Sequence, residues 1–175
     1  MSASSSIVAD RSLAPEGHRK IRWVEQHAPV LNAAFERYLN DGTLRGQNVA
    51  VCVPLEAKTA YLTLLLHRAG ANVALAGTAP GYVQDDVAAA IAEEGVTVFA
   101  VAGASAEEFE DHLIGTIRTN PVLLVDDRAE FAASQTRLII SLPLFRSSMI
   151  NPVIAGDLAT LTESADNYRL ISVLR

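Results

Sequence analysis

The sequence predicts an α/β fold: an open, doubly wound, mainly parallel sheet of the Rossmann-like or flavodoxin-like three-layer type, preceded by an N-terminal helical hairpin. Apolar runs carry this prediction, because they lack the alternation of a half-exposed strand and so indicate strands covered on both faces. Helical patterns separate these runs, as crossovers between parallel strands require. The predicted strands are residues 49–53, 72–76, 96–101 and 121–125, and the predicted helices between them are residues 56–69, 83–94 and 106–119.

The two ends of the chain carry weaker patterns. Residues 1–9 are predicted to be a flexible tail, and residues 10–175 a single α/β domain. Ser12 can cap the first helix, which Pro29 restarts and Gly42 ends. Nearer the C-terminus, the expected elements are strands over residues 137–142 and 152–155 and a helix over residues 158–174.

Composition and charge narrow the function classes. The chain has 175 residues, half of them apolar, and a net charge of −6. This length suits one domain with a full core, and the negative charge argues against nucleic acid and anionic membranes as partners. No apolar run reaches the roughly 18–20 residues of a membrane span, and no signal-peptide pattern follows the polar start. Cys52 is the only cysteine, so no internal disulfide can form, and the cytoplasm is the expected location.

The end of the first predicted strand organises the candidate site. The strand breaks at Pro54, and a helix then opens with Glu56, Lys58 and Thr59 in its first turn. Asp127 follows the fourth predicted strand. Because the carboxyl ends of parallel strands lie at one edge of the sheet, where open α/β sheets bind their ligands, we expect these side chains to share a cleft.

Several motifs occur in an order that resembles one known family. CVPLEAKTAYL is similar to the LHxEAKTA turn of S-adenosyl-L-homocysteine hydrolases, and ADRSLAPEGHRKIRWVEQHAPVL resembles their ADxxLAxxGxxxIxWAExxMPVL. Further along, QDDVAAA resembles STQDDVAAA, GVTVFA resembles GIPVFAW, and VDD resembles the start of IDDGGDLT. NPVIAGD and DNY resemble VPVIAVND and FDNxYG. The resemblance covers most of the chain and places it with the amino-terminal, substrate-binding half of these enzymes.

The resemblance implies a ligand and a chemistry. Members of the family are NAD-dependent hydrolases that oxidise the ribose 3′-OH of adenosylhomocysteine, eliminate homocysteine, add water and reduce the ribose again. Their amino-terminal half binds the nucleoside, and a separate Rossmann domain holds NAD. No GxGxxG motif occurs in this sequence. We therefore expect no cofactor on this chain, and no redox route that runs on it alone.

Residues that are functional in the family are replaced at several positions. Pro54 stands where the family has a substrate-site histidine, and proline has neither a side-chain donor nor a titratable group. The serine of STQD falls on Tyr82 or Val83. The segment that supplies a glutamate to the ribose is absent. The lysine that precedes FDN has no counterpart, and Thr162 and Glu163 occupy its neighbourhood.

The residues that remain define the candidate site. The expected catalytic residues are Glu56, Lys58 and Asp127, and the expected substrate-binding residues are Pro54, Thr59, Tyr82, Gln84, Asp85, Asp166 and Asn167. Several of them also have a purely structural interpretation. Glu56 would stabilise the helix dipole, Asp127 could start a turn, and Asp85 could cap its helix.

A metal site is not expected. The four histidines, His18, His27, His67 and His112, are scattered over predicted helices without i, i+4 pairing, whereas a zinc site needs clustered ligands. Cys52 lies within an apolar strand and is expected to be an inert core thiol.

Three functions are compatible with these residues. The first is a retooled, non-redox enzyme of the lyase, cyclase or isomerase type, in bacterial specialised metabolism, that uses the old nucleoside or thioether cleft. The second is a binding or partner protein without turnover, that is, a pseudoenzyme. The third is one half of a split hydrolase, against which Pro54 argues. The expected partner is an adenosine-like or thioether small molecule; nucleic acid and membranes are not expected, and a homo-oligomer is left open.

Overall fold

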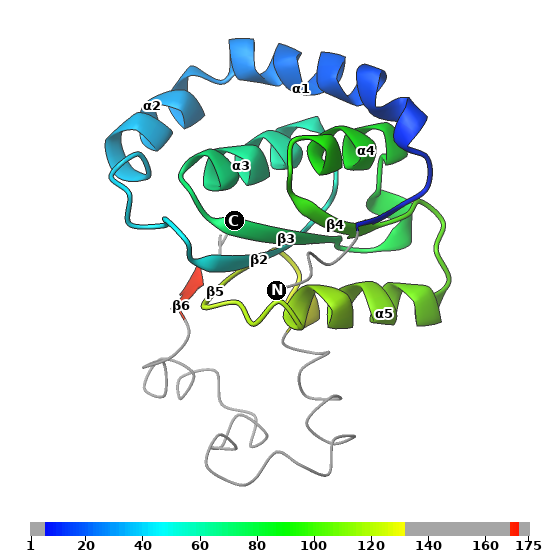
Figure 1. Ribbon diagram of the computed structural model, residues 1–175. Coiled ribbons are helices and arrows are strands. Elements are labelled where there is room, and N and C mark those ends of the chain that lie inside the picture. Colours follow the sequence, from blue (N-terminus) through cyan, green and yellow to red (C-terminus); the bar gives the residue numbers. More distant parts are fainter. Residues whose placement is uncertain (1–5, 132–168, 172–175) are drawn as a thin grey trace, which may run out of the picture.

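The computed structural model describes residues 6–131 and 169–171 and shows a six-stranded sheet with helices on both faces (Figure 1). The strands are β1 (Ile7–Val8), β2 (Asn48–Val53), β3 (Asn72–Gly77), β4 (Thr97–Ala100), β5 (Leu123–Asp126) and β6 (Arg169–Ile171). The helices are α1 (Ala14–His27), α2 (Pro29–Tyr38), α3 (Ala57–Arg68), α4 (Asp85–Glu93) and α5 (Ala106–Ile117), with the 3₁₀ helices η1 (Arg11–Leu13) and η2 (Pro80–Tyr82).

The strand order is β1-β4-β3-β2-β5-β6, and all neighbours run parallel. The chain leaves β2 in one direction to build β3 and β4, and then returns to the other side of β2 to build β5. This arrangement confirms the predicted doubly wound fold and the interior position of β2. The reversal between β2 and β5 is a topological switch point, and open α/β sheets bind ligands outside the carboxyl ends of the strands there.

The composition of β2 follows from its position between two layers. Val49, Val51 and Val53 belong to the core that the sheet forms with α1, α3 and α4. Ala50 and Cys52 belong to the core on the α5 side. All five side chains are buried, which is why the strand is apolar on both faces.

Helix α1 forms an outer layer over α3 and α4 (Figure 1). It lies close to α4 at Gly17, where a Cβ atom would come 2.0 Å from the carbonyl oxygen of Asp86. Lys20, one turn further along α1, places its Nζ 2.6 Å from Oδ2 of Asp86. The next helix begins at Pro29, as predicted.

The amino-terminal prediction is wrong at two points. Residues 1–9 were expected to be a flexible tail, but Ile7–Val8 pairs with β4, and the Ser6 hydroxyl accepts a hydrogen bond from the backbone N–H of Val98 at 3.0 Å. Ser12 does not cap a helix; its N–H instead donates to the carboxylate of Asp10 at 2.8 Å, in a 3₁₀ turn that precedes α1. The partner of β1 is some 90 residues away, so no local pattern reveals it.

The carboxyl-terminal prediction is wrong in one described segment. Residues 158–174 were expected to be helical, whereas Arg169–Ile171 forms β6 and pairs in parallel with β5. A strand of three residues is specified by its neighbour in the sheet rather than by its own pattern. The strands expected over residues 137–142 and 152–155 lie outside the described residues.

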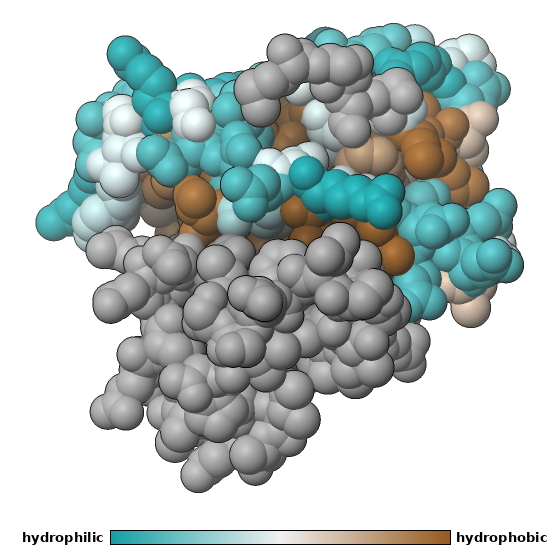
Figure 2. All heavy atoms as spheres, turned by 60° about the horizontal axis from the view of Figure 1, so that its bottom comes forward, coloured by the Kyte–Doolittle hydropathy of each residue, from teal (hydrophilic) through white to brown (hydrophobic). Residues whose placement is uncertain are grey.

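The surface mixes residue types on the face that Figure 2 brings forward, where hydrophilic and hydrophobic residues of the described part lie next to one another. Within residues 6–131 and 169–171, every helix is too short or too polar to cross a bilayer.

Candidate functional site

Thr59 holds the turn between β2 and α3. Its Oγ1 accepts the N–H of Glu56 at 3.2 Å and donates to the carbonyl oxygen of Pro54. Glu56 is the N-cap of α3, with an extended backbone. The hydroxyl of Thr59 is thus committed to backbone groups, and its expected contact with a ligand stays a prediction.

Glu56 and Lys58 form an ion pair at the start of α3. The distance from Lys58 Nζ to Glu56 Oε1 is 3.3 Å, and the Lys58 side chain is 75% exposed against 33% for Glu56. Exposed pairs of this kind contribute little to stability, so a ligand can replace one partner at small cost. The pair therefore offers one acceptor and one cation at the carboxyl edge of the sheet.

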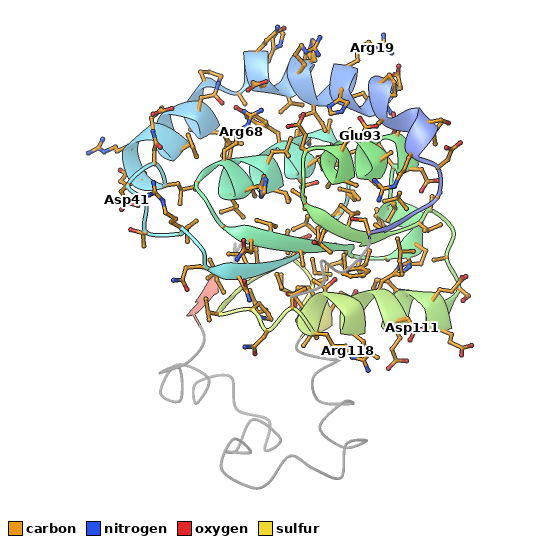
Figure 3. All side chains as sticks on the ribbon, viewed as in Figure 1. Arg19, Asp41, Arg68, Glu93, Asp111 and Arg118 are labelled. Atoms are coloured by element: carbon orange, nitrogen blue, oxygen red, sulfur yellow. The ribbon has the colours of Figure 1, made fainter. Side chains whose placement is uncertain are left out.

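A groove of about 420 Å³ runs between α1 and the start of α3. It is lined by Arg19, Lys20, Trp23 and Val24 of α1, and by Glu56, Ala57 and Lys58. Figure 3 shows Arg19 on the outer side of α1. The lining combines three cations, one carboxylate and one indole ring. Such a surface suits a ligand that has both a flat apolar part and polar or anionic groups.

Trp23 is the aromatic wall of this groove. It is 61% exposed, and its ring stacks on that of His27 with the centroids 4.3 Å apart. His27 Nδ1 lies 2.7 Å from the carbonyl oxygen of Trp23, which fixes the imidazole against the helix. The exposed face of the indole is thereby supported from behind.

The loop between β3 and α4 is tied to the end of β2 through Leu55. The N–H of Leu55 donates to the carbonyl oxygen of Tyr82 at 2.8 Å, and its carbonyl oxygen accepts the N–H of Gln84 at 3.0 Å. Leu55 is fully buried, whereas the Tyr82 side chain is 57% exposed. The Gln84 side chain accepts from Lys20 Nζ at 3.3 Å.

Asp85 has a structural contact. Its Oδ1 accepts the N–H of Ala102 at 2.9 Å and so holds the loop that follows β4 against the start of α4. The structural interpretation given to Asp85 from sequence was a helix cap, but α4 has no side-chain cap hydrogen bond, and Gln84 occupies the N-cap position.

The end of β5 separates the roles of two neighbouring aspartates. The carboxylate of Asp126 accepts the backbone N–H groups of Arg128, Glu130 and Phe131 at 3.3, 3.1 and 2.9 Å. Asp127 is exposed, and its N–H donates to the carbonyl oxygen of Cys52 at 3.1 Å. Asp126 therefore folds the turn, and Asp127 is left facing solvent at the carboxyl edge.

Arg128 is a residue that sequence reasoning missed. Its guanidinium carbon lies 5.9 Å from the centroid of the Tyr82 ring, and its Nε lies 3.9 Å from Oε1 of Glu130. Burial raises the pKa of the Glu130 carboxyl group, and the charge of Arg128 opposes that shift. No local pattern could have revealed the contact between Arg128 and Tyr82, because it depends on the strand order.

The predicted site residues fall into two groups at one edge of the sheet. Glu56 and Lys58 line the groove, and Pro54 and Thr59 shape the turn beneath it. Asp127 follows β5, the neighbour of β2, and does not line the groove. A single cleft that holds all of these residues stays a prediction. Asp166 and Asn167 lie outside the described residues.

Neither metal chemistry nor a reactive thiol has support in the described part of the chain. No cluster of three or more His, Cys, Asp or Glu side chains is placed there to hold a metal ion. Cys52 is fully buried, and burial together with nearby carboxylates raises the pKa of its thiol far above the ordinary value. This thiol is protonated and shielded, so it has the properties of a core residue.

Comparison with known proteins identifies the family of the chain. Residues 5–140 match the family model described as S-adenosyl-L-homocysteine hydrolase. The chain is 37% identical over 157 residues to an S-inosyl-L-homocysteine hydrolase of Methanococcus maripaludis, which covers 90% of this chain and 36% of that protein. It is 39% identical over 130 residues to an adenosylhomocysteinase of Pyrococcus abyssi, covering 74% of this chain and 31% of that protein. The chain thus spans about a third of the length of these relatives. It belongs to the S-adenosyl-L-homocysteine hydrolase family.

Proposed function

We propose that this chain binds a purine-nucleoside thioether of homocysteine at the carboxyl edge of its sheet. The observation that carries the proposal is the groove in which Trp23, Glu56 and Lys58 come together beside the end of β2. It offers a flat apolar wall for the purine ring, and a carboxylate and an ammonium group that can accept from and donate to the polar atoms of the nucleoside. The names of the relatives, which refer to S-inosyl- and S-adenosyl-homocysteine, support this ligand class.

The described residues do not fit the family's dinucleotide at this edge. The turn after β2 reads Pro54-Leu55-Glu56 where a nucleotide-binding turn would carry glycines, and the Leu55 side chain is fully buried in the core. Glu56 at the N-terminus of α3 would repel a pyrophosphate. The proposed function is therefore ligand binding, and no step of it runs through NAD on these residues.

Isothermal titration with S-adenosyl-L-homocysteine and S-inosyl-L-homocysteine tests the proposal. We expect saturable binding of at least one of them, and a loss of about tenfold in affinity in Lys58→Ala, because a charge-assisted contact disappears. Arg118→Ala is the matched control, since Arg118 lies on the outer side of α5 (Figure 3). Absence of saturable binding for both nucleoside thioethers would refute the proposal.

A second candidate is non-redox turnover of the same ligand by a lyase, cyclase or isomerase mechanism. The 3.3 Å contact between Glu56 and Lys58 favours it, because the pair places a base and an acid side by side. Mass spectrometry of S-adenosyl-L-homocysteine incubated with the protein, without added NAD, separates the two functions. An isomer or elimination products would support turnover, and an unchanged ligand would support binding alone.

A further inference from the structure

Two side chains from different loops meet across the end of β2. Tyr82 follows β3 and Arg128 follows β5, and β2 lies between these strands in the sheet. The guanidinium carbon of Arg128 is 5.9 Å from the Tyr82 ring centroid, which is within the range of a cation–π interaction. The contact therefore spans the switch point of the sheet, where doubly wound folds bind ligands.

Several of the positions at which this chain departs from the family pattern lie near this contact. Pro54, at the end of β2, replaces a histidine, and Tyr82 lies where the family's STQD begins. After Asp127, the pattern IDDGGDLT has two glycines where this chain has Arg128 and Ala129. Together these changes remove an imidazole and add an aromatic ring and a permanent cation at one edge.

The guanidinium of Arg128 has N–H donors that a ligand can reach. Its side chain is 52% exposed, and within the described residues the one carboxylate within 4.0 Å is Glu130, at 3.9 Å from Nε, which is longer than a hydrogen bond. A guanidinium presents a planar fork that matches a carboxylate in a bidentate geometry. The half-exposed position on the Tyr82 ring leaves that fork accessible.

The backbone holds Arg128 in place. Its N–H and that of Glu130 donate to the carboxylate of Asp126, which closes the turn. Ala129, the next residue, has φ +58°, a left-handed conformation that costs a residue with a Cβ about 1–2 kcal/mol. A turn that keeps this conformation fixes the direction in which the Arg128 side chain leaves the backbone.

We propose that Arg128, resting on the ring of Tyr82, binds the α-carboxylate of the homocysteine part of the ligand and so determines specificity. This inference rests on the proposed function, because the carboxylate is the anionic group of a nucleoside–homocysteine thioether. It assigns to the chain a recognition element that the glycines of the family pattern cannot provide.

The test compares two ligands that differ only in the carboxylate. S-adenosyl-L-homocysteine carries it, and 5′-deoxy-5′-(3-aminopropylthio)adenosine keeps the amine and lacks it. We expect the wild-type protein to prefer the first ligand by about tenfold, the size expected for one exposed charge-assisted contact. Arg128→Gln abolishes the preference by weakening the first ligand alone, whereas Arg118→Gln, on the outer side of α5, keeps it.

Two variants test the role of the Tyr82 ring. Tyr82→Ala reduces the preference for the carboxylate, and Tyr82→Phe restores it, because phenylalanine keeps the ring face on which the guanidinium rests. Circular dichroism of each variant monitors the fold. If Arg128→Gln fails to fold, two measurements still test the proposal. One is the comparison of the two ligands on the wild-type protein. The other is the conservative variant Arg128→Lys, which loses the planar fork of donors and is expected to lower the preference for the carboxylate.

The outcomes separate the two proposals. Equal wild-type affinity for the two ligands overturns the role of Arg128 and leaves the proposed function standing. Equal weakening of both ligands by Arg128→Gln overturns it as well, because Arg128 would then support the fold of the site. If the wild-type protein binds neither of these ligands nor S-inosyl-L-homocysteine, both proposals fail together.

Discussion

Gly17 of α1 lies directly against the backbone of Asp86 in α4. A Cβ atom at Gly17 would come 2.0 Å from the carbonyl oxygen of Asp86 and 2.8 Å from the Cβ of Ala90. A carbonyl oxygen within a helix cannot rotate away, so any side chain at Gly17 must push the two helices apart. The glycine of the family motif ADxxLAxxG therefore sets the distance between the outer layer and the core.

Gly17→Ala is expected to lower the free energy of unfolding by about 2 kcal/mol or more, because overpacking between rigid backbones is costly. Gly81→Ala is the matched control, since a Cβ there meets no atom within 4 Å. Chemical denaturation of the two variants measures the difference. Equal stability of the two variants would show that α1 can shift without loss.

The sequence predicted best the elements that are buried on both faces. β2 was predictable because all its inner residues are apolar, and α3 because the strand ends at Pro54 and a polar first turn follows. The interior position of β2 also follows from this composition. Such elements can be predicted from the local sequence, because burial on two faces produces a continuous apolar run.

The features that the sequence did not predict depend on partners far along the chain. β1 is only two residues long and exists because it pairs with β4. The contact of Arg128 with Tyr82 requires β3 and β5 to flank β2, and composition does not encode strand order. The different roles of Asp126 and Asp127 depend on the direction of each side chain, which a turn of this kind fixes only in three dimensions.

Ala129→Gly is expected to raise the free energy of unfolding by about 0.5–1 kcal/mol. Relief of the left-handed strain at φ +58° outweighs the extra backbone freedom that glycine brings to the unfolded chain. Asn120→Gly is the control, because Asn120 also has a positive φ, +55°, but asparagine tolerates it well. A destabilised Ala129→Gly would mean that the turn does not hold this conformation in solution.

His112 is expected to make the protein sensitive to mild acid. It is 5% exposed on α5, and burial lowers the pKa of its imidazole despite the opposing charges of Glu108 and Asp111. Because the unfolded chain then takes up the proton first, stability falls as the pH drops below about 6.5, and the loss continues until the pH passes the lower pKa of the folded state.

The measurement is the melting temperature between pH 8 and pH 5. His112→Gln should lessen the fall on the acid side while it leaves the neutral side flat. Arg118→Gln, at an exposed position just after the same helix, is the control and should keep the wild-type slope. Identical slopes in the wild-type protein and His112→Gln would exclude His112 as the source of acid sensitivity.

The two aspartates at the end of β5 should separate stability from ligand binding. Asp126→Ala leaves three backbone N–H groups without their acceptor and is expected to lower the free energy of unfolding by about 1–2 kcal/mol.

Asp127→Asn is expected to leave stability nearly unchanged, because Asp127 is exposed and only its backbone N–H is bonded, to Cys52. Asp127 follows β5 at the edge where the ligand is proposed to lie, so Asp127→Asn should instead weaken the binding of S-adenosyl-L-homocysteine, by about tenfold for the loss of one charged acceptor. Thermal unfolding and calorimetric titration of both variants provide the comparison. If Asp127→Asn lost stability and kept its affinity, Asp127 would be structural, and the candidate site would be limited to the groove beside α1.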